Sequence, residues 1–318
     1  MSPPSPLRLA VIGAGYMVAE HLRAFAACPE VELVGIHSRS SARAEALALA
    51  YPGLAVFPSI EALYTHTVAD LAVIAVPELA CQAVCEQAFR HPWTMLIEKP
   101  VGHTLAEANK IEQQAVARGA KVFVALNRRF YGSTLQLKQA LQGIEEQRVV
   151  TILDQEDAAG ALAAGQPPEV VHNWMYANSI HLIDYFSQLC RGDHISTQVL
   201  TPWNPVAPGA VIAQLRFSSG DTGLYQAMWN APGPWSVAVS TQQLRAELRP
   251  IEQLSLQQAG SRQLEPQAED PLDQQFKPGL LRQAQAAIKA ARGQDTILPT
   301  LAEANRSMAL IASIYGMA

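Results

Sequence analysis

The first 126 residues alternate short apolar runs with longer segments whose apolar positions recur every three or four residues. The apolar runs predict strands at Leu7 to Ile12, Glu32 to His37, Leu71 to Val76, Thr94 to Ile97 and Lys121 to Leu126. The intervening segments predict helices at Tyr16 to Ala27, Ser41 to Ala50, Leu79 to Arg90 and Thr104 to Arg118. This alternation is typical of βαβ units, so we expect a first α/β domain with a parallel sheet at residues 1–126.

Residues 127–318 follow a different rhythm and predict a second domain. A helix after Asn127 and a strand around Arg148 to Leu153 come first. A loop at Ala158 to Pro168 and a helix at Trp174 to Leu189 follow. Alternating segments then predict an antiparallel sheet with one covered face, at Val211 to Phe217, Leu224 to Trp229, Ser236 to Ser240 and Leu244 to Leu248. The Gln-rich segment 253–267 is a loop or an edge strand. Two helices close the chain, at Gly279 to Ala291 and Leu301 to Tyr315, the second opened by a capping box of Thr300 and Glu303.

Composition adds exclusions to this picture. The 318 residues are 49% hydrophobic and 16% charged, enough for a sizeable core in roughly two domains. The formal net charge of −5, without a clustered basic face, disfavours nucleic acid as a partner. Charged residues and prolines interrupt every apolar stretch, which disfavours a membrane span, and no signal peptide is apparent. We therefore expect a cytoplasmic protein that acts on a small molecule. Four cysteines without a Cys-x-x-Cys pair predict buried free thiols.

A glycine-rich turn joins the first predicted strand to the first predicted helix. It reads Gly13-Ala14-Gly15, followed by Tyr16 and Met17 at the start of the helix. In this context Gly13 makes the tight turn, Gly15 admits a pyrophosphate, and the helix N-terminus supplies oriented N–H groups. Val18 stands where a third glycine is usual. The turn predicts a dinucleotide site.

The end of the second strand bears on which dinucleotide binds. An NAD enzyme normally places a carboxylate there for the ribose 2′-hydroxyl, whereas this chain has Ser38 and Arg39, with Arg43 one helical turn later. Hydroxyl and guanidinium groups suit a 2′-phosphate. We therefore expect NADP to be preferred over NAD. The alternative is that Arg39 is a solvated residue at the start of a helix.

The string Glu98-Lys99-Pro100 ends the fourth predicted strand, at the carboxyl edge where open α/β sheets bind their ligands. Near a nicotinamide, a partly desolvated Lys99 can polarise or protonate the oxygen of a carbinol or carbonyl. The alternative is a surface lysine after a strand.

The whole pattern resembles the Gfo/Idh/MocA oxidoreductase family. The features that carry the resemblance are the early Gly-x-Gly turn, Val76-Pro77, Glu98-Lys99-Pro100, Asn127-Arg-Arg-Phe130 and His181-x-x-Asp184. The resemblance implies an N-terminal Rossmann dinucleotide-binding domain plus a C-terminal α/β domain with a large, mostly antiparallel open sheet. Family members mostly oxidise or reduce sugars, cyclitols and nucleotide sugars with NAD(P).

By matching motif, the resemblance implies that Lys99 and His181 are catalytic. The family often has Asp four residues before this His, where this chain has Ala177. Asn178 or Asp184 must then orient His181, or catalysis is reduced or absent. The residues expected at the substrate are Lys99, Arg129, Trp174, Asn178, His181 and Asp184. Those expected at the cofactor are Gly13, Ala14, Gly15, Tyr16, Met17, Ser38, Arg39, Arg43, Val76, Pro77, Glu78, Glu98, Lys99, Pro100 and Asn127.

Several alternatives remain open at this stage. Arg129 either contacts substrate or braces the cleft, and Trp174 and Tyr176 are either walls against a sugar ring or buried anchors. A metal site at His172, His181 and His194 has no supporting motif. A catalytically silent NADP(H)-binding sensor or assembly subunit is the alternative function. An exposed face of the sheet in the second domain predicts a homodimer or homotetramer. Substrate identity and reaction direction are not encoded in any motif.

Overall fold

The computed structural model describes residues 5–317, and the chain forms two compact units. The first unit comprises the residues up to Gly102, Ala106–Asn127 and Gln275–Asn305, and the second comprises His103–Leu105, Arg128–Gln274 and the residues from Arg306 onward. The predicted boundary after residue 126 therefore lies within two residues of a division in the structure. The structure differs from the predicted two domains in that Gln275–Asn305 is part of the first unit.

The first unit is built on a six-stranded parallel sheet with strand order β3-β2-β1-β4-β5-β6. This order is that of the dinucleotide-binding doubly wound fold. Its central strands β1 and β4 are almost entirely buried, which explains their continuous apolar runs. The strands are β1 (Leu7–Ile12), β2 (Val31–His37), β3 (Ala55–Phe57), β4 (Leu71–Ile74), β5 (Thr94–Glu98) and β6 (Lys121–Ala125). The helices before residue 127 are α1 (Tyr16–Ala26), α2 (Ser41–Ala48), α3 (Ile60–Thr67), α4 (Glu78–Ala88) and α5 (Leu105–Arg118).

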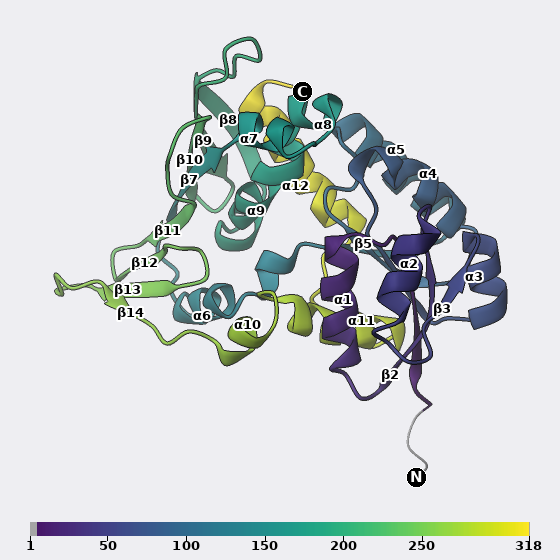
Figure 1. Cartoon of the computed structure of the whole chain (residues 1–318). Coiled ribbons are helices and arrows are strands. Elements are labelled where there is room, and N and C mark those ends of the chain that lie inside the picture. Colours follow the sequence, from purple (N-terminus) through teal and green to yellow (C-terminus); the bar gives the residue numbers. More distant parts are fainter. Residues whose placement is uncertain (1–4, 318) are drawn as a thin grey trace. The chain divides into compact units, whose positions relative to one another are not determined.

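The contacts of Gln275–Asn305 explain why this late segment belongs to the first unit. Helix α11 (Leu280–Ala291) packs against α1 and also contacts β4 and β5 (Figure 1). Its buried face is rich in Leu and Ala, whose apolar surface must be covered. Further along, the N–H of Val124 donates to the carbonyl of Pro299 at 2.8 Å. Sequence spacing alone shows that α11 is amphipathic but not which sheet it covers.

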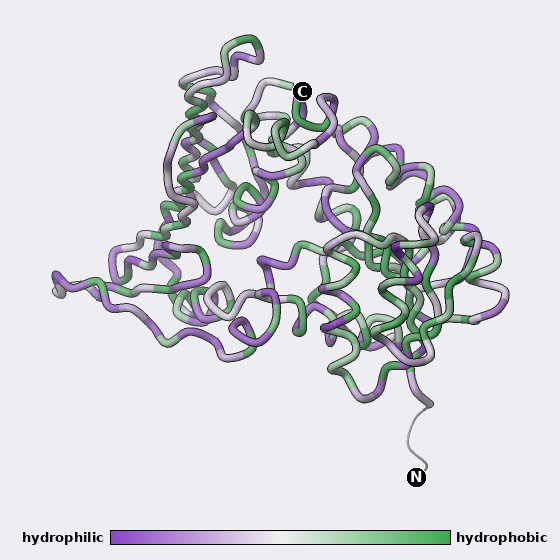
Figure 2. The backbone as a smooth tube through the Cα atoms, in the orientation of Figure 1, coloured by the Kyte–Doolittle hydropathy of each residue, from purple (hydrophilic) through white to green (hydrophobic). Residues whose placement is uncertain are grey.

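The second unit is built on an eight-stranded sheet with strand order β14-β13-β12-β11-β7-β10-β9-β8. Neighbouring strands are antiparallel except for the parallel pair β7 and β10. Buried and more exposed residues alternate along β7, β9 and β10, and the tube in Figure 2 alternates in colour along these strands. The strands are β7 (Val149–Glu156), β8 (His194–Thr201), β9 (Ala210–Phe217), β10 (Thr222–Trp229), β11 (Ser236–Ser240), β12 (Leu244–Leu248), β13 (Leu254–Gln258) and β14 (Glu265–Pro266).

Helices cover one face of this sheet, with α9 against β7 and β11 and α6 against β12 and β13. The remaining helical elements are η1 (Asn127–Phe130), α6 (Gly132–Ala140), α7 (Ala158–Ala163), α8 (Pro168–His172), the π-helix η2 (Met175–Ser179), α9 (Ile180–Leu189), α10 (Pro271–Gln275) and α12 (Leu301–Tyr315). The predicted capping box is confirmed, because Thr300 N donates to Glu303 Oε2 at 2.9 Å and Glu303 N donates to Thr300 Oγ1 at 3.2 Å.

Two local predictions for this unit need correction. The predicted loop from Ala158 to Pro168 contains α7, because Asp157 caps a helix there by accepting from Gly160 N at 2.7 Å. The predicted helix from Trp174 to Leu189 is interrupted by the wider turn of η2. The Gln-rich segment forms β13 and the edge strand β14, in agreement with one of its two interpretations.

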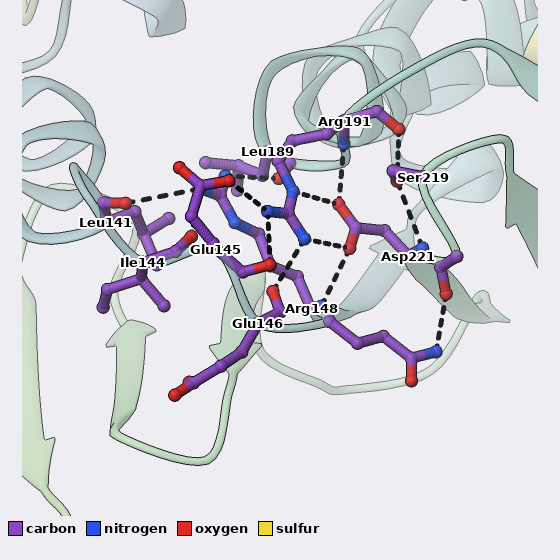
Figure 3. Close-up of polar contacts among 11 residues, drawn as sticks. Leu141, Ile144, Glu145, Glu146, Arg148, Leu189, Arg191, Ser219 and Asp221 are labelled. Carbon is purple, nitrogen blue, oxygen red and sulfur yellow. Dashed lines mark hydrogen bonds and ion pairs between the residues drawn. The ribbon is translucent and has the colours of Figure 1, made fainter.

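A cluster around Asp221 ties the turn before β10 to the end of α9 and the start of β7 (Figure 3). Its carboxylate accepts from Arg148 N at 2.9 Å and Arg191 N at 2.8 Å, and also from the Arg191 guanidinium. Burial alone would raise the pKa of Asp221, but these donors outweigh it and hold the pKa at about 2. This side chain therefore joins three segments of the second unit.

All four cysteines are free and buried, as expected, and burial raises the pKa of Cys28 to about 11 and that of Cys190 to about 12. No helix within residues 5–317 is both long enough and apolar enough to cross a membrane.

Candidate active site

The turn between β1 and α1 has the geometry of a phosphate cradle. Gly13 has a φ of 120°, and a Cβ atom added there would overlap the carbonyl oxygen of Ala75. A Cβ atom at Gly15 would meet no heavy atom within 4 Å, so the space beside this residue is open. The first turn of α1 has no side-chain cap and no acidic residue. Its N-terminal N–H groups thus suit the pyrophosphate of a dinucleotide, and this arrangement fits the expected cofactor.

Two further features lie near this turn. Val18, at the place of the usual third glycine, is fully buried and lies against Gly13, so its side chain fills the contact between helix and strand. Tyr16 is 67% exposed, and the ammonium of Lys277 lies 5.4 Å from the centre of its ring. Lys277, which the sequence patterns did not single out, brings a positive charge to the same helix end.

The segment after β2 presents cations and no carboxylate. Ser38 is half-buried and its Oγ accepts from Ser40 N at 3.2 Å, while Arg39 and Arg43 are exposed. Neither arginine has a hydrogen bond or ion pair to another residue within the described range. Both guanidinium groups therefore remain available to a phosphate.

The carboxyl ends of β4 and β5 carry the other residues predicted for the first unit. Val76 and Pro77 lead from β4 into α4, which begins at Glu78. At the end of β5, Glu98 accepts from two directions. Its Oε1 lies 2.7 Å from Nε2 of the buried His21, and its Oε2 accepts from Lys99 N at 3.2 Å.

Glu98 thus connects α1 to the turn that carries Lys99, and it is committed to protein partners at both oxygens. Lys99 is half-buried and Pro100 is buried. Asn127, at the start of η1, is 6% exposed and its side chain donates to the carbonyl of Pro278 at 3.2 Å. In the first unit the structure therefore gathers the Gly13 turn, Ser38, Pro77 and Lys99 at the carboxyl edge of one sheet.

In the second unit, His181 and Asn178 are half-exposed and three residues apart across the junction of η2 and α9. The His181 ring lies 6.4 Å from the ring of Trp235, and its Nδ1 is buried without a hydrogen-bond partner among the described residues. The Arg128 guanidinium lies 4.6 Å from the centre of the Trp235 ring. Burial lowers the pKa of Arg128, whose Nε and Nη1 also have no partner within residues 5–317. Buried unpaired polar atoms are rare, and their grouping marks a site for a polar ligand.

Arg129 and Asp184 form a buried ion pair. Arg129 Nε donates to Asp184 Oδ2 at 2.8 Å and Nη2 donates to Oδ1 at 2.7 Å, while Ser307 Oγ donates to Oδ1 at 2.7 Å. The two residues are 7% and 4% exposed. Of the two interpretations of Arg129, this geometry favours the brace, because both oxygens of its partner are engaged within the fold. Within residues 5–317, Asp184 makes no hydrogen bond to His181.

The two aromatic residues before Asn178 differ in exposure. Tyr176 is 2% exposed, in agreement with a buried anchor, whereas Trp174 is half-exposed. Lys99 belongs to the first unit and His181 to the second, so their joint action is a matter for proposal. Among the described residues no group of three or more His, Cys, Asp or Glu side chains is arranged to hold a metal ion.

Several polar residues of these sites were not predicted. Asp154 and Glu156 alternate with Gln155 on β7, and both side chains are buried on the helix-covered face. Burial raises the pKa of Asp154, and burial together with the neighbouring Asp154 charge raises that of Glu156 well above its ordinary value. The signal was present, because two acidic residues occupy positions where an alternating strand has apolar ones. The predicted strand ended at Leu153, so these positions were not considered.

Comparisons with known proteins agree with this geometry. The model of the Gfo/Idh/MocA family, described as "Oxidoreductase family, NAD-binding Rossmann fold", matches residues 7–126. An uncharacterized oxidoreductase of Schizosaccharomyces pombe is 26% identical over 210 residues, which is 64% of this chain and 57% of that protein. The match thus spans little more than half the length of this curated relative.

Solved structures share the fold over nearly the whole chain. A dehydrogenase from Chromobacterium violaceum superposes with a TM-score of 0.82 at 18% identity, covering 99% of this chain and 96% of the other. UDP-N-acetylglucosamine 3-dehydrogenase from Acidithiobacillus ferrooxidans gives a TM-score of 0.79 at 18% identity, with 98% and 99% covered. At these identities the likeness establishes the architecture of both units, including the parallel sheet and the larger, mostly antiparallel one.

Proposed function

Since residues 7–126 match the model of the Gfo/Idh/MocA oxidoreductase family with its NAD-binding Rossmann fold, we propose that this chain is an NADP(H)-preferring dehydrogenase of a sugar-like secondary alcohol or ketone. The observation that carries the proposal is the turn at Gly13 and Gly15. It leaves open space beside Gly15, at a helix end with neither side-chain cap nor acidic residue.

The cofactor preference is supported by the segment after β2. Arg39 follows Ser38 directly, and Arg43 lies one helical turn after Arg39. Both arginines are exposed and have no carboxylate partner within residues 5–317. A ribose 2′-phosphate carries the charge that these groups can neutralise. A 2′-hydroxyl would find no carboxylate acceptor among Ser38, Arg39 and Ser40.

The nicotinamide of the bound cofactor supplies or accepts the hydride at its C4 atom. Lys99, at the end of β5, holds a positive charge toward the substrate oxygen and donates a hydrogen bond to it. His181 accepts the hydroxyl proton in oxidation and returns it in reduction. The substrate is proposed to be oriented by the polar and aromatic side chains that share the second unit with His181. These are Arg128, Trp174, Asn178 and Trp235.

The proposal is tested first by calorimetric titration of the protein with NADPH and with NADH. We expect tighter binding of NADPH, and we expect Arg39→Ala to erase the difference by removing one charge-assisted contact, about 1.5 to 3 kcal/mol. Arg118→Ala is the matched control, because it removes one arginine from the last turn of α5. It should leave both affinities unchanged. If neither nucleotide binds, the dehydrogenase function is wrong.

Activity is tested next by following NADPH absorbance with a panel that begins with UDP-N-acetylglucosamine, the substrate named for one structural relative, and includes cyclitols and free sugars. Lys99→Ala and His181→Ala should each lower kcat by about a hundredfold or more, and His181→Ala should retain the NADPH affinity of the parent protein. A protein that binds NADPH yet turns over none of the panel would instead support the silent sensor or assembly subunit.

We also propose that the chain forms a homodimer or homotetramer through the open face of the second sheet. This face of β10 exposes Leu224 and Met228 to 38% and 40%. Sedimentation that shows only monomer at micromolar concentration would contradict this proposal.

A further inference from the structure

A buried carboxylate beneath the π-turn holds the two residues that precede α9. Glu156, on β7, is 0% exposed. Its Oε2 accepts from Asn178 Nδ2 at 2.7 Å, and its Oε1 accepts from Ser179 Oγ at 2.6 Å. Both donors belong to η2, the single wide turn of the helix, and π-turns of this kind occur frequently at functional sites. Glu156 therefore connects the sheet to the turn that leads to His181.

Asp154 lies beside Glu156 on the same buried face of β7. Tyr225 donates to Asp154 Oδ2 at 2.7 Å, and Asp154 Oδ1 has no hydrogen-bond partner among the described residues. Burial and the neighbouring Asp154 charge raise the pKa of Glu156 well above its ordinary value. In the geometry of the site both Glu156 oxygens act as acceptors, for Asn178 and Ser179.

The bond to Glu156 fixes which end of the Asn178 carboxamide faces outward. A carboxamide has one donor end and one acceptor end. Because the NH₂ group is turned toward Glu156, Oδ1 is turned away from it. Asn178 is half-exposed, and within residues 5–317 its side chain makes no other hydrogen bond. Three residues later, His181 lies on the same side of the helix with its own Nδ1 unpaired within that range.

We propose that Glu156 is a positioning residue that presents Asn178 Oδ1 as a fixed acceptor for a hydroxyl group of the substrate, next to His181. The inference rests on the proposed dehydrogenase function and narrows its substrate class. The molecule must carry an O–H donor beside the reacting carbon, as polyols and sugars do. A substrate that offers only an acceptor at that position is rejected, because Asn178 cannot turn without leaving Glu156 unpaired.

The first test reads the Asn178 side chain directly in the NADPH-loaded full chain. Nuclear magnetic resonance of the ¹⁵N-labelled protein gives the exchange rate of the Asn178 NH₂ protons with water, and the resonances are assigned by their loss in Asn178→Asp. We expect slow exchange in the parent protein and exchange faster by about tenfold or more in Glu156→Leu, which removes the acceptor. If Glu156→Leu does not fold, Glu156→Gln replaces it, with a smaller acceleration because one acceptor oxygen remains.

The matched control is Asp154→Asn, which changes the adjacent buried carboxyl group. Its amide can donate to Glu156 and accept from Tyr225, so Asn178 should keep its slow exchange. Fast exchange in the parent protein, slow exchange retained in both Glu156 variants, or equal acceleration in Asp154→Asn would each overturn the proposal.

The second test uses the substrate found in the activity panel and its analogue that lacks the hydroxyl group next to the reacting carbon. We expect the parent protein to prefer the hydroxylated form in kcat/KM by about tenfold or more, and Glu156→Leu to lose that preference. Glu247→Leu, which removes a carboxylate from β12 of the same sheet, should retain it. NADPH binding is measured separately in the same proteins. Absence of NADPH binding would contradict the dehydrogenase function itself rather than the role of Glu156. An equal preference in all three proteins would overturn the role of Glu156 alone.

Discussion

Single carboxylates in this chain act according to what their oxygens already bind. Glu98, Asp184 and Glu156 all accept from protein groups at both oxygens, but one donor to Glu156 is the side chain of the half-exposed Asn178. Asp221 accepts from Arg148 and Arg191 and has a depressed pKa of about 2. The same chemical group thus serves as brace, orienter or anchor, depending on its donors.

The low pKa of Asp221 predicts that the free energy of unfolding depends on pH. Its folded pKa of about 2 lies below the ordinary 3.8, so the ionised form stabilises the fold above about pH 4, and this stabilisation is lost as the pH falls toward 2. Allowing for solvent around the 27% exposed Arg191 side chain, we expect about 1 to 2 kcal/mol. Asp221→Asn should therefore lower the free energy of unfolding more at pH 7 than at pH 3.

Urea unfolding of the two proteins at both pH values checks this prediction. Asp193→Asn, at an exposed neighbouring position, should show no such dependence. A deficit in Asp221→Asn that is the same at pH 7 and pH 3 would mean that the ionised carboxylate is not the source of the stabilisation.

The sequence predicts a residue's place where a motif has a fixed position in a fold. Gly13 and Gly15 lie in the predicted turn and Lys99 follows the predicted strand, because these positions follow from the order of elements, while their roles stay predictions. Asp154 and Glu156 were missed because the predicted strand ends at Leu153, and the partners of Glu156 lie 22 and 23 residues further along the chain. Arg129 was given two roles, and only its contact with Asp184 could choose between them.

At the scale of elements, the turn from β1 to α1 is the proposed nucleotide site and contains two glycines with different constraints. Gly13 has positive φ and no room for a side chain, while Gly15 faces open space. We expect Gly13→Ala to destabilise the fold by about 2 kcal/mol or more, because the backbone must shift away from Ala75. Gly15→Ala should leave the melting temperature nearly unchanged but weaken NADPH binding, because its methyl group occupies the cradle.

Thermal unfolding and NADPH titration of both variants check this contrast. Equal effects of the two variants on stability, or undiminished NADPH affinity in Gly15→Ala, would show that the open space beside Gly15 is not where the nucleotide binds.

Elements with strong periodicity were predicted well and edge elements poorly. Leu301–Tyr315 was predicted without error, and the buried strands β1, β11 and β12 have the predicted bounds. Strand β8 was missed because most of its residues are exposed, which removes the alternation that reveals a strand. Strand β3 has three residues, too few for any period to show.

At the scale of the whole molecule, the first unit is discontinuous in sequence. Residues 275–305 supply α11 and the Pro299 contact to β6, both needed to cover its sheet. We expect a fragment of residues 1–127 to lack a cooperative thermal transition and to bind NADPH weakly, because the apolar surface beneath α11 is exposed. Joining residues 275–305 to it by a flexible linker should restore both properties.

Circular dichroism melting curves and NADPH titration of the two fragments check this expectation. A fragment of residues 1–127 that binds NADPH as tightly as the full chain would show that α11 is dispensable.

The interrupted course of the first unit also sets an order of events at the ribosome. Its opening 127 residues emerge early but wait for α11, which is made only after Arg128–Gln274 has been synthesised. At roughly 5 to 20 residues per second, this delay is about 7 to 30 seconds. The second unit is completed later still, because its last segment, from Arg306 onward, is synthesised after residues 275–305. While the first unit waits for α11, the uncovered apolar surface of its sheet is a natural target for chaperones.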